Sequence, residues 1–206
     1  MSDERQQAPV PAVRPREPWQ TGYWGPTNPD EHPAVIAVRE RFPEAFEEAV
    51  NCRDEMTIWV KREALREVVA FLRDHPELRY NHLTDLTAVD MLDLRDEPRF
   101  DVVVQLYSIP RRQRLRVKCG VNDGETVPSL VPLFAGANWL ERECYDMFGI
   151  VFEGHPDLRR ILLPDDWDEG HPLRKDYPLR GYRDYVQPGF ERPAPRVRGS
   201  LPRPRP

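Results

Sequence analysis

The sequence has few cysteines, and no two of them are spaced to bind a metal together. Cys52, Cys119 and Cys144 stand 67 and 25 residues apart. Three is an odd number, so a disulfide framework is not expected. An iron–sulfur cluster held by this chain alone is equally unexpected, because such clusters normally need four closely organised ligands. The cysteines therefore predict buried or semi-buried free thiols.

Long apolar segments are also lacking. The longest uninterrupted run, MFGIVF at 147–152, has six residues, whereas a transmembrane helix needs about 20. The N-terminal residues MSDERQQAPV do not show the basic-then-apolar order of a secretory signal. We therefore expect a chain that lies in the cytoplasm or docks on a membrane protein from that side.

No glycine-rich loop follows any predicted strand, so neither a dinucleotide fingerprint nor a P-loop is expected. The net charge is −5, and residues 192–206 carry five arginines and no acid, so residues 1–191 carry −10. An acidic body of this kind argues against nucleic-acid binding.

Proline is abundant and unevenly placed. Of 23 prolines, seven lie in residues 1–33 and five in 193–206. Because proline resists both helix and sheet, both ends are predicted to be extended arms. The basic arm is compatible with a segment that lies along a partner, with a disordered segment, and with a ligand for a proline-binding adaptor domain. The predicted organisation is an arm over 1–33, an α+β domain over 34–137, a docking segment over 138–191 and an arm over 192–206.

The hydrophobic pattern of the domain predicts an α+β fold. Apolar residues at spacings of three and four predict helices over 33–50 and 62–74, the first of them interrupted by Pro43. Alternating or β-branched residues predict strands over 55–61, 85–92, 99–109 and 114–121. Because short polar links join the last three strands, they are expected to form an antiparallel meander. We expect a mixed or antiparallel sheet with helices packed on one face, followed by a long extended C-terminal docking segment.

Residues 138–149, NWLERECYDMFG, predict a short helix. Asn138 can serve as its N-cap with Glu141 in a capping box, and Gly149 can end it in a left-handed turn. Beyond Gly149 the sequence predicts a mostly extended chain whose side chains bury little surface against one another. It is therefore predicted to need a surface to lie on.

Three catalytic or metal-binding arrangements come into question in this region. Glu143 and Asp146 are three residues apart, as an acid–base pair could be, but Arg142 precedes Asp146 by four and could neutralise it. Residues 165–176 imitate a calcium loop but place Trp167 at a position that needs a ligand. His155 and His171 each precede a proline, outside any zinc-binding array. The density of arginine and aromatic residues favours protein–protein docking instead.

The order of motifs in this segment resembles a known family. Residues 138–179 contain ERE-x-YDMFGI, then GHP-x-LRR-x-L-x-P-D-x-W, then GHPLRKDYP. This pattern resembles the signature of the thirty-kilodalton subunits, also called C subunits, of respiratory complex I, the proton-translocating NADH:quinone oxidoreductase. The upstream stretch LTDLTAVD at 83–90 and the strands after it are also similar to the family's α+β domain.

The resemblance implies a peripheral-arm subunit without a cofactor or catalytic residues of its own. FMN and iron–sulfur clusters would lie in partner subunits, with NADH and quinone as substrates of the complex. The partners implied are chiefly the quinone-site subunit and the terminal-cluster subunit, at the cytoplasmic face of a bacterial cell membrane. Residues expected in ion pairs and anchors, within the chain or to the quinone-site subunit, are Arg142, Glu143, Asp146, Arg159, Arg160, Trp167, His171, Arg174, Lys175, Asp176 and Tyr177.

Two other functions stay open on the sequence. A related assembly, such as a membrane-bound hydrogenase or a ferredoxin- or coenzyme-driven oxidoreductase, uses a similar subunit. A stand-alone enzyme would have to work with Glu143 and His171, and it would have to be active as a purified monomer.

Overall fold

The structure, a computed structural model, describes residues 28–52 and 55–179. Within these ranges a five-stranded sheet has the order β1-β2-β5-β4-β3. The strands are β1 (Phe46–Cys52), β2 (Glu55–Val60), β3 (His82–Asp90), β4 (Phe100–Ser108) and β5 (Gln113–Val121). The strands β3, β4 and β5 form the expected antiparallel meander, while β2 joins β5 in parallel. The sheet is therefore mixed, which is one of the two arrangements expected.

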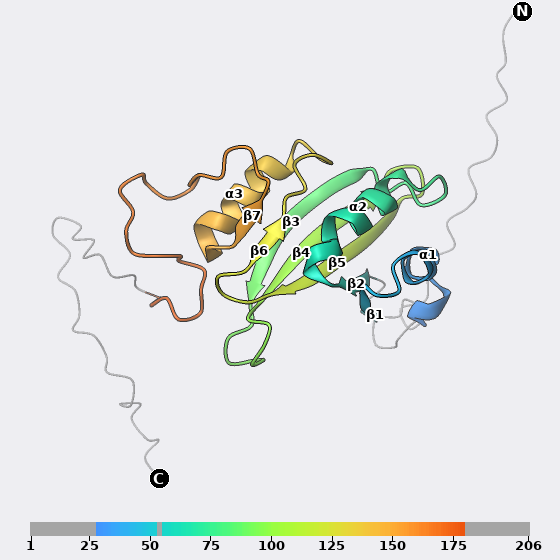
Figure 1. Cartoon of the computed structure of the whole chain (residues 1–206), viewed down its shortest axis with the longest axis horizontal. Coiled ribbons are helices and arrows are strands. Elements are labelled where there is room, and N and C mark those ends of the chain that lie inside the picture. Colours follow the sequence, from blue (N-terminus) through green and yellow to red (C-terminus); the bar gives the residue numbers. More distant parts are fainter. Residues whose placement is uncertain (1–27, 53–54, 180–206) are drawn as a thin grey trace, which may run out of the picture.

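The helices cover one face of this sheet (Figure 1). They are α1 (Pro33–Arg41), α2 (Leu65–Asp74) and α3 (Ala137–Phe148), with 3-10 turns at Pro29–Glu31 and Arg62–Ala64. Buried residues of all three helices belong to one apolar cluster with the sheet. On the covered face, four cross-strand neighbours lie side by side in the order Leu86 (β3), Val104 (β4), Val117 (β5) and Ile58 (β2). The expected α+β fold is thus confirmed.

The prediction of one helix over residues 33–50 is wrong for the second half of that range. It ends at Arg41, and Phe46–Cys52 forms the edge strand β1, antiparallel to β2. Pro43 lacks an amide donor and cannot continue the helix, which explains the break. Val50, expected on the buried face of the helix, is 39% exposed.

The part beyond β5 is built around α3. A short parallel pair, β6 (Thr126–Pro128) with β7 (Val151–Glu153), brackets this helix and was not predicted. From residue 154 to 179 the chain contains no helix or strand, and it loops beside α3 (Figure 1). The predicted arms, apart from residues 28–33, lie outside the described residues, as do residues 180–191 of the predicted docking segment.

Candidate functional site

The helix α3 carries buried polar side chains on the side that faces the rest of the chain. Glu141 is completely buried and accepts hydrogen bonds from the Ser129 hydroxyl at 2.7 Å and the Leu130 amide at 2.6 Å. Burial raises the pKa of Glu141, although both hydrogen bonds oppose that change. The capping-box prediction is therefore wrong. The N-cap is Gly136, with no side-chain cap, and Glu141 instead fixes the chain before the helix.

Asp146, in the last turn of α3, is also completely buried. Its carboxylate accepts hydrogen bonds from the amides of three consecutive residues, at 3.1, 2.8 and 2.9 Å, and from the Arg160 guanidinium at 2.9 Å. The three amide donors are Ile161, Leu162 and Leu163. Burial alone would oppose ionisation, but these donors outweigh it and hold the pKa of Asp146 below its usual value. The carboxylate therefore anchors the extended segment to the helix.

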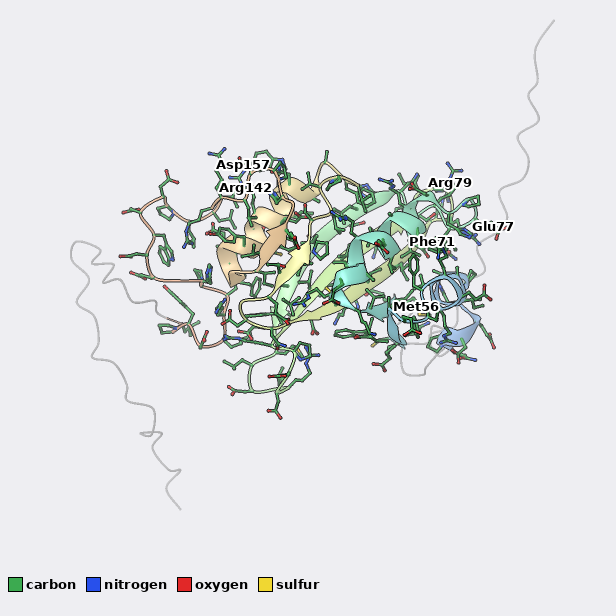
Figure 2. All side chains as sticks on the ribbon, viewed as in Figure 1. Met56, Phe71, Glu77, Arg79, Arg142 and Asp157 are labelled. Atoms are coloured by element: carbon green, nitrogen blue, oxygen red, sulfur yellow. The ribbon has the colours of Figure 1, made fainter. Side chains whose placement is uncertain are left out.

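Arg142 makes different contacts from those expected. Its guanidinium does not pair with Asp146 but donates to the backbone carbonyls of Arg159 at 3.0 Å and Arg160 at 2.9 Å. The same guanidinium lies 5.3 Å from the ring centre of Trp139. Figure 2 shows Arg142 on α3 beside Asp157 of the extended segment, which pairs with Arg159. The helix thus holds the segment at two successive turns.

The C-terminus of α3 is held by residues 171–174. His171 Nδ1 lies 2.9 Å from the Asp146 carbonyl oxygen, and Arg174 Nε donates to the Phe148 carbonyl at 2.7 Å. Such contacts satisfy carbonyl groups that a helix end leaves without partners. Gly149 ends the helix with φ +79°, as predicted, and a Cβ there would lie 2.6 Å from His171 Nε2. Burial lowers the pKa of His171, and the neutral ring donates from Nδ1.

A network of ion pairs ties the end of the segment to the sheet. Arg174 binds both carboxylate oxygens of Asp123, at 2.8 and 2.9 Å. Arg99 lies 3.0 Å from the carboxylates of both Asp90 and Asp176. The amide of Lys175 donates to Asp90 at 2.9 Å. The contacts of Arg174 and Lys175 join positions that are 51 and 85 residues apart in the sequence.

Of the remaining predicted residues, Glu143 and Arg159 are exposed and Trp167 and Tyr177 are half-buried. Glu143 is exposed on α3, and Arg159 pairs with Asp157. The Trp167 indole donates to the Gly170 carbonyl at 3.0 Å, and the Tyr177 hydroxyl to Glu169 at 3.0 Å. Five of the predicted residues form ion pairs within the described part of the chain: Asp146, Arg159, Arg160, Arg174 and Asp176. A part in a subunit interface stays a prediction.

Sequence reasoning missed three members of this network, Asp90, Arg99 and Asp123, and it gave Glu141 the role of a helix cap that the structure does not show. Asp90 is the last residue of β3, directly before the connection towards Arg99, and this position was the available signal for a structural carboxylate. No local signal connects Asp123 to Arg174, because the pairing depends on where the extended segment runs.

The arrangement offers little for acid–base or metal chemistry. Asp146 is enclosed by its donors, so it cannot act with Glu143 as a catalytic pair. His155 Nδ1 accepts from the Asp157 amide, and its Nε2 lies 3.1 Å from the Asn138 carbonyl oxygen. Among residues 28–52 and 55–179, no three His, Cys, Asp or Glu side chains come together as a metal site. Likewise, no helix in these ranges is long and apolar enough to cross a membrane.

Two of the three cysteines are packing residues. Cys119 and Cys144 are buried, while Cys52 is exposed. Burial raises the pKa of the Cys119 thiol to about 12 and that of Cys144 also above its usual value. Because the thiolate is the reactive form, both buried thiols are unreactive near neutral pH.

Several large apolar side chains on and around α3 remain exposed. Trp139 lies within α3 and is 61% exposed, and Leu162, whose amide donates to Asp146, is 60% exposed. We call these two residues, together with Leu173, Leu179 and Val151, the exposed apolar set. Exposed apolar side chains indicate an interaction surface where they form a contiguous patch, and such a surface at these residues stays a prediction.

Comparison with known proteins identifies the family. Residues 58–183 match the family described as "Respiratory-chain NADH dehydrogenase, 30 Kd subunit". The chain is 52% identical over 149 residues to a relative from Geotalea uraniireducens, covering 72% of this chain and 88% of that protein. It is 50% identical over 151 residues to a relative from Roseiflexus sp., covering 73% and 85%. Both relatives are named as C subunits of NADH-quinone oxidoreductase.

A solved structure shares the fold. A chain of the archaeal membrane-bound sulfane sulfur reductase superimposes with a TM-score of 0.61 at 21% identity, covering 79% of this chain and 96% of that one. The family match covers most of the sheet, α3 and the anchored segment. The chain therefore belongs to the family of the 30 Kd subunit of respiratory-chain NADH dehydrogenase.

Proposed function

We propose that this chain is a subunit of a proton-translocating NADH:quinone oxidoreductase that carries no cofactor itself and scaffolds the quinone-site subunit. The terminal-cluster subunit is its second neighbour, and the complex lies at the cytoplasmic face of the bacterial membrane. FMN and the iron–sulfur clusters belong to partner subunits. The support from relatives is direct, since those that are about 50% identical are named as C subunits of NADH-quinone oxidoreductase.

One observation carries the scaffolding role. The segment from 159 to 176 has no secondary structure, yet buried groups of α3 and the sheet hold its backbone. Its leucines at 162 and 173 nevertheless point outward, 60% and 49% exposed. An extended chain pre-organised with its apolar side chains outward loses little conformational entropy when it binds a partner.

The charges support the same role. Breaking a buried ion pair by removing one partner costs about 3–5 kcal/mol. The pairs of Arg160 with Asp146 and of Arg99 with Asp90 each have one fully buried carboxylate. They hold the segment in one conformation, so a variant at these positions should impair assembly rather than a chemical step.

The test is recovery of the complex through this chain. A tagged chain is purified from its native membrane after gentle solubilisation, and the eluate is analysed by mass spectrometry and by NADH:quinone activity. Co-purification of flavin- and cluster-bearing subunits with inhibitor-sensitive activity is the expected result. Recovery of the chain without partners would contradict the proposal.

A related oxidoreductase is the second candidate, and the shared fold with the sulfane sulfur reductase chain is what keeps it open. The same eluate separates the two. A complex that contains hydrogenase-type or ferredoxin-dependent subunits and no NADH-oxidising flavin subunit would favour the second candidate.

A further inference from the structure

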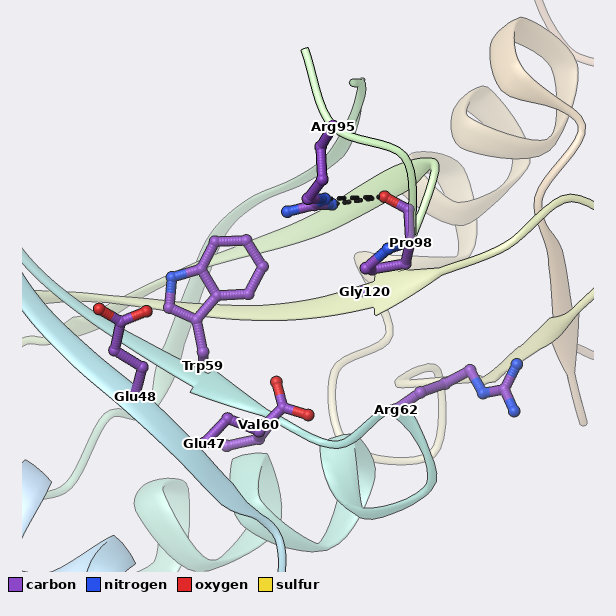
Figure 3. A pocket seen from close by; sticks show the side chains of 8 residues that line it. All are labelled: Glu47, Glu48, Trp59, Val60, Arg62, Arg95, Pro98 and Gly120. Carbon is purple, nitrogen blue, oxygen red and sulfur yellow. Dashed lines mark hydrogen bonds between the residues drawn. The ribbon is translucent and has the colours of Figure 1, made fainter. Parts of the chain in front are cut away.

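The sheet face opposite the helices carries a cavity of about 250 Å³ near the β1 edge. Figure 3 shows the Trp59 indole in this cavity, between Glu48 on β1 and Arg95 on the β3–β4 connection. We call it the Trp59 cavity. Its lining residues are Glu47, Glu48, Trp59, Val60, Arg62, Arg95, Pro98 and Gly120.

The register between β1 and β2 explains why Glu47 and Glu48 both line the same cavity as Trp59. Glu48 is the direct cross-strand partner of Trp59, and Trp59 in turn lies beside Lys118 of β5. The register of β1 shifts between Phe46 and Glu48, so Glu47 is an additional residue in the ladder. An additional residue of this kind re-aims side chains at a sheet edge, and Glu47 and Glu48 both line the cavity.

The cationic side chains of the cavity already have acceptors. Arg95 donates to the Pro98 carbonyl and pairs with Asp101. Arg62 pairs with Glu63 at 2.8 Å and with Glu125 at 2.7 Å. By contrast, no ion pair with another residue in 28–52 or 55–179 involves Glu47 or Glu48, and both are exposed. The site therefore presents two carboxylates available to a cation, beside the apolar surfaces of Trp59 and Pro98.

We propose that the C-terminal arm of this chain, residues 192–206, docks in the Trp59 cavity. Its arginines pair with Glu47 and Glu48, and its prolines lie against Trp59 and Pro98. The arm contains five arginines, five prolines and no acid. Proline-rich segments bind aromatic-lined grooves at low entropic cost, because their extended conformation is already restricted.

The path of the chain places the arm within reach. Asp176 pairs with Arg99 at 3.0 Å, and Arg99 directly follows Pro98 of the cavity. The described chain ends three residues later, at Leu179, and Arg192 is thirteen residues further on. At about 3.1 Å per residue, an extended linker of that length spans about 40 Å. Such a short tether produces a high effective concentration of the arm at the cavity.

Charge separates this arm from the N-terminal residues as occupants. Residues 1–27 contain three acids and three arginines, so they offer the two carboxylates no net attraction. Of these two terminal segments, the C-terminal arm is the one that complements the cavity in charge.

The experiment is site-specific photo-cross-linking of the full chain at low micromolar concentration. A benzophenone amino acid replaces Val197, and mass spectrometry locates the cross-linked peptides. The expected products join residue 197 to peptides of β1 and β2 within one copy. Their yield should fall about fivefold in the Glu47→Gln/Glu48→Gln variant, the effect of losing two exposed ion pairs, and should fall similarly in Arg196→Gln/Arg198→Gln.

A matched control is Glu40→Gln/Glu44→Gln, which removes two exposed carboxylates outside the cavity lining and should leave the yield unchanged. The proposal is overturned by cross-links to other parts of the chain, by cross-links between copies, or by an equal yield in all variants. The same label in the purified complex tests a partner subunit as receptor, and products with partners alone would also overturn it.

Discussion

Arg160 donates a hydrogen bond at 2.9 Å to the buried carboxylate of Asp146, fourteen residues earlier in the chain. The same carboxylate accepts hydrogen bonds from the backbone amides of Ile161, Leu162 and Leu163. It therefore fixes the backbone of a stretch that contains no helix or strand. A buried charge with this many donors holds one conformation, because any rearrangement would leave it unsatisfied. The segment proposed to meet a partner is thereby shaped before the partner arrives.

Asp146→Asn should destabilise the chain by about 2–3 kcal/mol, because the amide loses the charge that Arg160 and three backbone amides stabilise. The free energy of unfolding in urea measures the effect. Glu143→Gln, on the exposed side of the same helix, is the matched control and should stay within about 0.5 kcal/mol of wild type. Equal stability of the two variants would contradict the anchoring role of Asp146.

Gly149→Ala should be more damaging than Gly124→Ala. Both glycines have positive φ, +79° and +83°, so alanine is strained at both, by about 1 kcal/mol. Only at Gly149 would the new Cβ also meet His171 Nε2, at 2.6 Å, whereas nothing lies within 4 Å at Gly124. Thermal unfolding of both variants measures the difference, and equal losses would show that His171 moves away freely.

The free energy of unfolding should decrease as the pH falls. The pKa values of Asp90, Asp123 and Asp146 are lowered in the folded chain. These groups therefore contribute stability above their unfolded pKa of about 3.9, and that contribution is lost as pH falls below it. The raised pKa of Glu141 acts in the opposite direction, since its folded form retains a proton that the unfolded chain releases. Urea unfolding between pH 6 and about 3 should show a net loss, with a shallower slope in Asp146→Asn; an identical slope would contradict this assignment.

Arg174→Ala should reduce the yield of the complex more than Arg159→Ala. Arg174 is 18% exposed and joins Asp123 and the Phe148 carbonyl, whereas Arg159 is 71% exposed and its side chain pairs with Asp157. The amount of co-purified partner subunits, normalised to tagged chain, is the measurement. If the Arg174 variant assembled fully but lost quinone reduction, the scaffold proposal would be wrong.

Replacing both Trp139 and Leu162 by alanine should weaken partner binding at least about tenfold, as hot-spot residues do, and should lower stability by no more than about 1 kcal/mol, because the contact of Trp139 with Arg142 is lost. Both side chains are exposed in the chain itself, so their truncation creates no internal cavity. Co-purification and urea unfolding are measured together. The control variant truncates Leu94 and Ile109, which are 77% and 57% exposed on other connections; an equal effect on binding would contradict the assigned surface.

Most of the sheet and the helix α2 follow from the sequence by itself. Periodicity located α2 and the strands β2, β4 and β5 closely, because burial on one face imposes a fixed spacing on apolar residues. The end of α3 at Gly149 also followed, since glycine adopts that left-handed turn without steric cost. The contiguous motifs of 138–179 indicated the family, and the comparison confirmed it.

Tertiary structure alone decided which partner each charge takes. Asp146 had Arg142 four residues away on the same helix, yet it pairs with Arg160, because burial requires more donors than one side chain can supply. Glu141 had the spacing of a helix cap but lies in the core, where Ser129 and Leu130 satisfy it. The strand β1 formed where a helix was expected, since the edge of β2 needed hydrogen-bond partners and Pro43 had already ended the helix. Partner choice at these positions depends on the path of distant chain segments, which local spacing does not encode.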